Sequence, residues 1–498
     1  MSGWPGQPVI YEVNTAVWLG GLSRAAGEPV TLASVTEGDW DAITPAGADA
    51  VWLMGVWERS PAGLELARAN EGLLESFRAA LPDLQEQDII GSPYCVRRYV
   101  ADERFGGPAG LATARAALAA RGVRLILDYV PNHVAPDHPW VTEHPEFFIQ
   151  GNDDDLRADP ASWLLVAGQV LAHGRDPYFP PWPDVVQLNA FAAATRAATA
   201  RTLSGIADQC DGIRCDMAML MFNDIFGKTW GSRAGQRPDE EFWPAVIAQL
   251  RTRHPDTVLI AEAYWDTEWA LQQQGFGFCY DKRLYDRILE QDPPDVHGHL
   301  LADLGYQARL VRFLENHDEP RIAGQLPAVL ERAAAVTIAT LPGATFWHEG
   351  QFEGRRVRVP VFLSRRPDEP ADQELAGWYR DLLREVAEQR VRTGAWQLLP
   401  VTGWPDNTSG DNLIAWSWTP GAGAGGVSRH VVVANLAQAP AQAQIPLPWP
   451  DLPGHRWSLL DLLSREDFNR DGDQLAGPGL YVDMKPGQCY LLAVHAAA

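Results

Sequence analysis

Residues 109–133 read AGLATARAALAARGVRLILDYVPNH, and this stretch decides the fold. Its first part, up to Gly122, carries apolar side chains at helical spacing. The next part, VRLILDYV (123–130), is a strand-like apolar run that ends beside polar residues. A helix that leads directly into such a strand is typical of a parallel sheet, because parallel strands need a covering crossover helix.

The same rhythm extends over the first 390 residues, with amphipathic stretches such as 242–254 and 372–390 between the apolar runs. The seven further strand-like runs are VIYEV (9–13), AVWLMGV (50–56), DGIRCDM (211–217), TVLIAEAYW (257–265), FGFCYD (276–281), ARLVRFL (308–314) and ATFWHEG (344–350). Eight strands in this pattern predict a (β/α)8 TIM barrel of the α/β class, with inserted loops. A doubly wound parallel sheet is the alternative that the pattern leaves open.

Two segments depart from this rhythm. Residues 131–189 are rich in Pro, Asp and Trp, and we expect an inserted subdomain there, after the third strand and over the barrel mouth. Short apolar runs separated by Gly, Pro and Asn fill residues 401–498, which predicts a C-terminal antiparallel β-sandwich. The barrel itself is then expected over residues 1–130 and 190–400.

Composition narrows the possible partners. The formal net charge is -23, with 64 acidic against 41 basic residues, and this balance repels nucleic acid and anionic membranes. The five cysteines show neither a disulfide framework nor a metal-binding spacing. We expect a cytoplasmic protein, because the N-terminus lacks a signal-peptide pattern and no stretch approaches the ~18 apolar residues of a membrane span.

Polar residues gather where the strand-like runs end. Asp128 ends the third run, Arg214 and Asp216 lie in the fourth, Glu262 in the fifth, and Asp318 follows the seventh. The C-terminal ends of barrel strands share one face, so these side chains would converge. Several carboxylates at one mouth suit acid–base and nucleophilic chemistry at a glycosidic bond.

The motifs around these residues resemble those of one family, the α-amylase family of glycoside hydrolases. LDYVPNH (127–133), DGIRCDMA (211–218), LIAEAYW (259–265) and FLENHDEPR (313–321) resemble its four signatures, in family order. Supporting similarity lies in GSPYCVRRYV (91–100), WPDVVQLN (182–189) and TLPGATFWHEGQ (340–351). The motifs extend over almost the whole chain.

The resemblance implies three catalytic roles. Asp216 would be the nucleophile that attacks the anomeric carbon. Glu262 would be the general acid and then the general base, and Asp318 would hold ring hydroxyls and stabilise the oxocarbenium-like transition state. This division needs one carboxyl protonated while its neighbour is ionised.

The resemblance also implies substrate-binding residues. Arg214 lies two residues from Asp216 on a strand, so both side chains point the same way and the cation would keep Asp216 ionised. His133 and His317 would donate to sugar hydroxyls, and Tyr94 could stack on the sugar at the cleavage site. The last predicted substrate-binding residue is Asp128.

Three departures from the family pattern bear on specificity. Met219 and Leu220 stand where many starch-cleaving members carry a Lys-His pair, and Arg98 stands where an acidic residue is usual. Loss of the Lys removes a contact to the leaving-group sugar. Loss of the His weakens the case for the family's calcium site, in which Asn132 would be one ligand. We therefore expect no cofactor and no metal site, and calcium binding is doubtful.

These features favour a retaining glycoside hydrolase that acts on α-linked glucosides or short maltooligosaccharides by double displacement. The partner would be a small-molecule carbohydrate. Transglycosylation or isomerisation through the same covalent intermediate is the alternative, and the sequence does not separate it from hydrolysis. An inactive barrel that serves as a binding subunit is a third possibility, disfavoured by the intact carboxylates, and a barrel enzyme of unrelated chemistry is a fourth.

Overall fold

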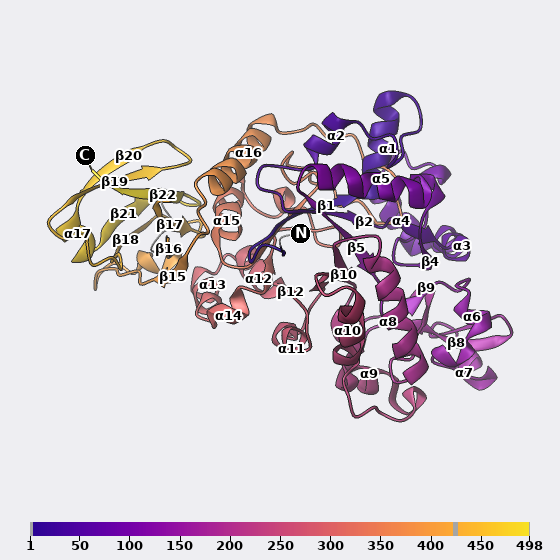
Figure 1. The fold of residues 1–498 in the computed structure, drawn as a ribbon. Helices are drawn as coiled ribbons and strands as arrows, with labels where there is room; N and C mark the ends of the chain where they lie inside the picture. The colour runs from indigo at the N-terminus through magenta and orange to yellow at the C-terminus, as the bar shows by residue number, and fades with distance from the viewer. Residues whose placement is uncertain (1–2, 422–426, 498) are drawn as a thin grey trace.

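The computed structural model describes residues 3–421 and 427–497. Eight parallel strands close into a barrel in the order β1-β2-β5-β10-β11-β12-β13-β14 (Figure 1). Their bounds are Val9–Asn14, Ala50–Met54, Arg124–Tyr129, Gly212–Cys215, Val258–Ala261, Phe278–Tyr280, Leu310–Arg312 and Ala344–His348. The predicted (β/α)8 barrel is confirmed, and the doubly wound alternative is wrong because the sheet closes on itself.

Helices cover the outside of the barrel (Figure 1). They are α1 (Thr15–Ala26), α2 (Glu37–Ala42), α3 (Pro61–Ala69), α4 (Glu71–Ala80), α5 (Gly107–Ala120), α8 (Ala193–Ala207), α9 (Asn223–Trp230), α10 (Phe242–Arg253), α11 (Glu268–Gln273), α12 (Lys282–Glu290), α13 (Pro293–Leu300), α14 (Leu304–Gln307), α15 (Ala328–Thr340) and α16 (Gln373–Glu388). Helix α16 shows why they form: the Asp372 side chain caps its first turn by accepting from the Leu375 N–H, and Leu375, Tyr379 and Leu382 bury one face.

Alternate residues of the strands fill the barrel interior. Its apolar layer includes Ile10, Ile126, Ile260 and Phe346. Side chains two positions apart on a strand share a face, so the residue two positions further along the chain, within the strand or directly after its end, lies nearer the mouth on the same side. Those residues are Glu12, Asp128, Glu262 and His348.

Several strands end earlier than the apolar runs predict. Strand β10 stops at Cys215 and β11 at Ala261, so Asp216 and Glu262 are the first residues beyond each strand. The backbone then turns into the left-handed region at Met217 (φ 37°) and at Trp265 (φ 61°), a conformation that breaks a strand. These two carboxyls therefore lie on loops that follow directly from the barrel strands.

The segment after β5 forms a separate four-stranded antiparallel sheet in the order β6-β9-β8-β7, beside the barrel (Figure 1). Its elements are β6 (His133–Val134), α6 (Trp140–Glu143), α7 (Asp153–Ala158), β7 (Trp163–Val166), β8 (Gln169–Gly174) and β9 (Trp182–Gln187). A small apolar cluster that includes Phe147, Phe148 and Leu171 supports it. A short hairpin of β3 (Trp57–Arg59) and β4 (Val96–Ala101) lies within the loop after β2. The domain limits at 131 and 189 stay a prediction.

The C-terminal part is an antiparallel sandwich of a six-stranded sheet, β15-β16-β17-β22-β19-β20, and a two-stranded sheet, β18-β21. Its elements are β15 (Ala395–Leu399), β16 (Leu413–Thr419), β17 (Arg429–Asn435), β18 (Ala441–Ile445), β19 (Arg456–Asp461), β20 (Asp467–Asp471), α17 (Gly472–Ala476), β21 (Leu480–Met484) and β22 (Cys489–Ala496). Strand β15 precedes residue 401, where this part was expected to begin. The sheet joins the barrel side through α15, where the Trp418 indole N–H donates to the carbonyl of Thr340 (2.7 Å). In the described residues, no helix has the length and apolar character to cross a membrane.

Candidate active site

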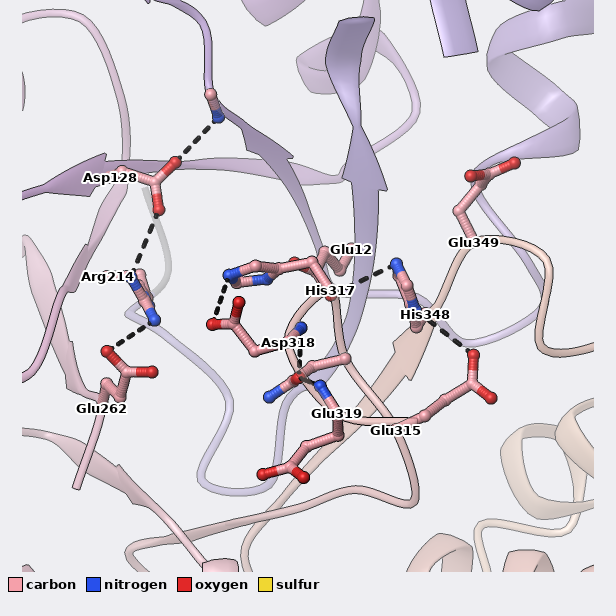
Figure 2. Close-up of polar contacts among 12 residues, drawn as sticks. Glu12, Asp128, Arg214, Glu262, Glu315, His317, Asp318, Glu319, His348 and Glu349 are labelled. Atoms are coloured by element: carbon pink, nitrogen blue, oxygen red, sulfur yellow. Dashed lines mark hydrogen bonds and ion pairs between the residues drawn. The ribbon is translucent and has the colours of Figure 1, made fainter. Parts of the chain in front are cut away.

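A single buried arginine organises the carboxylates at the barrel mouth. Arg214, whose side chain is 1% exposed, places Nη1 2.8 Å from Asp216 and Nη2 2.8 Å from Glu262. Nη1 also lies 3.9 Å from Asp128. Figure 2 shows Arg214 between the carboxylates of Asp128 and Glu262. The structure thus brings three predicted site carboxylates together around the guanidinium of a fourth predicted site residue, Arg214.

Aromatic rings enclose that guanidinium. Its central carbon lies 5.2 Å from the ring centre of Trp52, 5.4 Å from Tyr94 and 5.8 Å from Tyr280. These faces stabilise a cation while keeping water away from it. The interactions of Arg214 with carboxylates are therefore stronger than they would be at the protein surface.

Asp128 is the innermost of these carboxylates. Its Oδ2 accepts the backbone N–H of Gly55 (3.0 Å), and its own carbonyl accepts the indole N–H of Trp57 (2.7 Å). Burial raises the pKa of Asp128, against the lowering effect of Arg214. With 3% of its side chain exposed, Asp128 supports Arg214 from below the mouth.

Asp216 and Glu262 differ in their surroundings. Burial raises the pKa of Asp216, and both the charge and the hydrogen bond of Arg214 oppose this rise. Burial raises the pKa of Glu262 to about 7, with Arg214 opposing and the negative charge of Asp216 adding to the rise. Glu262 thus keeps a proton near neutral pH, as a general acid must.

Two groups from neighbouring loops hold the Glu262 carboxyl. The backbone N–H of Met217 donates to Oε2 (2.6 Å), and the Tyr264 hydroxyl donates to Oε1 (3.0 Å). The left-handed backbone at Met217 forms the turn in which this N–H reaches Glu262. Strain of this kind is characteristic of sites where geometry is fixed for function.

Asp318 is the most accessible of the three carboxylates, with 47% of its side chain exposed against 11% for Asp216 and 3% for Glu262. The Asn316 side chain accepts the backbone N–H groups of Asp318 and Glu319 (both 2.8 Å), which fixes the loop after β13. Burial would raise the pKa of Asp318, but the charge and hydrogen bond of His317 lower it to about 2. It is an ionised group facing the mouth.

His317 joins this loop to the first strand. Figure 2 shows His317 between Glu12 and Asp318: its Nε2 lies 3.0 Å from Asp318, and its Nδ1 lies 2.5 Å from Glu12. Nε2 also lies 2.7 Å from the Tyr94 hydroxyl. Burial lowers the pKa of His317, but Asp318 and Glu12 raise it well above its usual value. The Tyr94 ring stacks on the imidazole at 5.4 Å.

His133 lies outside this contact network. It packs against Trp182, with ring centres 5.2 Å apart, and burial lowers its pKa to about 4, against an opposing effect of the Tyr94 backbone. A neutral imidazole beside Tyr94 remains available to a sugar hydroxyl. Its role in substrate binding stays a prediction.

Sequence reasoning missed Glu12, Tyr264 and His348. Glu12 is fully buried and contacts His317, although 305 residues separate them in the chain. The available signal was the period of two in VIYEV, which puts Glu12 on the inward face with Ile10. Tyr264 was visible beside Glu262, but only the loop geometry shows that its hydroxyl reaches the acid.

The residues at the family's calcium position do not fit that ion. The Gln187 side-chain amide donates to both the carbonyl oxygen and the Oδ1 of Asn132 (2.9 Å each). Leu220 brings only an apolar side chain. In the part of the chain that the structure describes, no group of three or more His, Cys, Asp or Glu side chains is arranged to hold a metal.

Known proteins resemble the chain at modest identity. No protein-family model matches it. The α-amylase MalA of Haloarcula japonica is 23% identical over 454 residues, which cover 89% of this chain and 57% of that protein. α-Amylase 3 of Dictyoglomus thermophilum is 21% identical over 270 residues, half of each protein. The chain thus spans little more than half the length of these curated relatives.

Solved structures share the architecture over the whole chain. A maltogenic α-amylase from Thermotoga neapolitana superimposes with a TM-score of 0.69 at 17% identity, covering 99% of this chain and all of that one. At this identity the likeness speaks for the fold. The curated relatives named above are α-amylases, so the chain resembles α-amylases in sequence as well as in fold.

Proposed function

We propose that the chain is a retaining glycosidase that acts on α-linked glucosides or short maltooligosaccharides. The observation that carries this proposal is the pair Asp216 and Glu262 on the two terminal nitrogens of Arg214. One shared cation holds a nucleophile and an acid close together, and burial keeps a proton on Glu262 up to a pH of about 7. Double displacement needs this arrangement of an ionised and a protonated carboxyl.

In the first step Asp216 attacks the anomeric carbon, and the bond to the leaving oxygen breaks. Glu262 transfers its proton to that oxygen, and a glycosyl ester on Asp216 remains. In the second step water attacks the anomeric carbon and gives a proton to the Glu262 carboxylate, and the bond to the Asp216 carboxylate breaks. Two inversions return the α configuration.

Asp318 and His317 act on the sugar ring between these steps. The Asp318 carboxylate, with its low pKa, is ionised at any working pH and can accept ring hydroxyls. Negative charge at this place also stabilises the positive charge that develops on the ring in the transition state. His317 and Tyr94, whose hydroxyl contacts Nε2 of His317, would lie beside that ring.

Transfer to a sugar acceptor is the second candidate, and one observation favours it. The loop between β8 and β9 exposes two neighbouring rings, Tyr178 (62%) and Phe179 (66%). Tyr178 contacts Trp265, three residues after Glu262, with ring centres 4.7 Å apart. Exposed aromatic faces on the acid side of the mouth offer surface to a second sugar, which would then compete with water.

Product analysis tests both candidates. The wild-type chain is incubated with maltooligosaccharides, sucrose, trehalose and starch, and proton NMR records the first-formed product. Hydrolysis gives a free sugar that is initially α, and transfer gives a longer or rearranged glycoside. A β product contradicts double displacement, and no product from any of these glucosides contradicts the proposed substrate class.

A further inference from the structure

Glu12 is a buried charge that neither the fold nor the double-displacement step accounts for. Its side chain is fully buried at the end of β1. Oε1 lies 2.5 Å from Nδ1 of His317, whereas Oε2 has no hydrogen-bond partner among the described residues and lies 3.8 Å from Nε2 of His348. A half-satisfied buried carboxylate destabilises a fold, so its presence calls for a functional explanation.

The surroundings of His317 give that explanation. Each ring nitrogen faces an acceptor: Nδ1 faces Glu12, and Nε2 faces Asp318 and the Tyr94 hydroxyl. The Tyr94 ring is stacked on the imidazole with 26° between the planes, and Trp52 meets it edge-on at 81°. The ring is therefore fixed in its plane, and only its protonation state can change.

We propose that Glu12 is a positioning residue that keeps His317 doubly protonated, so that its Nε2–H stays directed at Asp318 and at the sugar held there. The inference rests on the proposed function, because it assigns Glu12 to the site that binds the reacting sugar. Glu12 touches neither Asp318 nor the reacting carbon and acts through His317 alone. Its charge fixes Nε2 as a donor.

The other groups near His317 do not replace Glu12. His348 lies on the other side of Glu12 and is neutral, because burial and Arg321 lower its pKa to about 3. Asp318 cannot replace Glu12, because it is the carboxylate that faces the Nε2–H of His317. The remaining titratable or charged groups that face the ring or the pocket beside it are Tyr94, Asp128, Arg214, Arg321, Glu349, Arg358 and Arg366.

The test replaces the Glu12 charge and keeps its shape. In Glu12→Gln the amide oxygen still accepts from Nδ1, but the pKa of His317 falls because one of its two anionic partners is gone. Once neutral, the ring keeps its proton on Nδ1 and turns a lone pair on Nε2 toward the Asp318 carboxylate. Activity should then decrease as the pH rises through the new pKa of His317, by roughly tenfold for each pH unit above it.

The substrate is chosen so that Glu262 does not mask this effect. α-Glucosyl fluoride releases fluoride, which needs no proton from an acid, so the wild-type kcat/KM for formation of the glycosyl ester should show no alkaline limb from pH 5 to 8. Glu12→Gln should show one. Tyr94→Phe removes the hydroxyl beside Nε2 and leaves the Glu12 carboxylate in place. Its kcat/KM should therefore show no alkaline limb between pH 5 and 8.

A matched control is Glu331→Gln, which replaces a buried carboxyl of α15 that accepts a hydrogen bond from the Tyr379 hydroxyl (2.9 Å) and, in the described part of the chain, forms no hydrogen bond or ion pair with His317 or the three site carboxylates. Its pH profile should equal that of the wild type. Imidazole NMR, with the His317 resonance assigned by His317→Gln, reads the protonation state of the wild-type protein directly, so the test does not depend on the folding of Glu12→Gln. A wild-type His317 that is neutral at pH 7 overturns the proposal, and so does a Glu12→Gln profile that falls by the same factor at every pH.

Failure of the proposed function has a different signature. If no α-glucoside is turned over, the glycosidase proposal fails, while the NMR titration of His317 in the wild type and in Glu12→Gln still decides the role of Glu12. A shift of the His317 titration to lower pH in Glu12→Gln supports that role, and an unchanged titration refutes it.

Discussion

Replacement of Glu262 by Gln should abolish the proposed glycosidase activity and, at alkaline pH, stabilise the protein. Glu262 is 2% exposed, and burial raises its pKa from 4.5 to about 7 even though Arg214 opposes the rise. At about 1.4 kcal/mol for each pH unit, the folded protein disfavours the ionised acid by about 3 kcal/mol relative to the unfolded chain. Gln has nearly the same shape and carries no charge at any pH.

The sign of the effect follows from proton counting. Between pH 4.5 and about 7 the folded state holds a proton on Glu262 that the unfolded state has released, so wild-type stability falls as the pH rises through this window. Below pH 4.5 both states are protonated and the cost disappears. The variant should therefore be about as stable as the wild type at pH 4 and about 3 kcal/mol more stable at pH 8.

Urea unfolding of both proteins at pH 4 and pH 8 measures this difference. Turnover of a disaccharide should fall by about 10²–10⁴, the usual contribution of a general acid. Glu331→Gln is the matched control: burial raises the pKa of Glu331 to about 7 as well, so it should gain stability at pH 8 and keep its activity. A Glu262→Gln stability difference that does not change with pH, or that favours the wild type at pH 8, refutes the reasoning.

Three further outcomes are expected. Asp216→Ala should abolish turnover with the far-UV circular dichroism spectrum unchanged, and retention of more than a few per cent of activity would assign the nucleophile elsewhere. EDTA should leave the Tm unchanged, because the Gln187 side-chain amide already donates to Oδ1 of Asn132 and Leu220 has no polar side chain. A fall in Tm that calcium restores would refute this. The ratio kcat/KM should be highest on maltose or maltotriose and should not increase through maltohexaose to soluble starch. The reason is that Met219 cannot supply the ionic contact of a Lys to the leaving-group sugar. A kcat/KM that increases steadily with chain length, and is highest on starch, would indicate an open groove.

The sequence predicts the barrel well because its signals are local. Each barrel strand lies within an apolar run, except that β1 extends one residue beyond VIYEV, and α16 follows the period of its apolar residues. The strand ends were placed too late at β10 and β11. The left-handed turns at Met217 and Trp265 have no sequence signature, since neither residue type favours that conformation and the loop contacts impose it.

In the candidate site, too, local features could be predicted and contacts between distant segments could not. Asp216, Glu262 and Asp318 could be predicted because each lies in a short motif tied to the end of one strand. Which group protonates, orients or screens each carboxyl depends on contacts between distant segments. Asp128 and Arg214 are 86 residues apart in the chain, and the parallel pairing of β5 with β10, in which they are register partners, brings them within 3.9 Å.

The energetics of this cluster explain why its charges matter for function. Burial raises the pKa of Asp128, Asp216 and Glu262 alike, so each of these carboxylates is less stable in the folded protein than in water despite the nearby Arg214. Apolar side chains of similar volume would pack in the same layer of the barrel at lower cost. A fold that keeps four buried ionisable groups at its mouth is less stable there, and the carboxyl that still holds its proton near pH 7 is what the proposed chemistry requires.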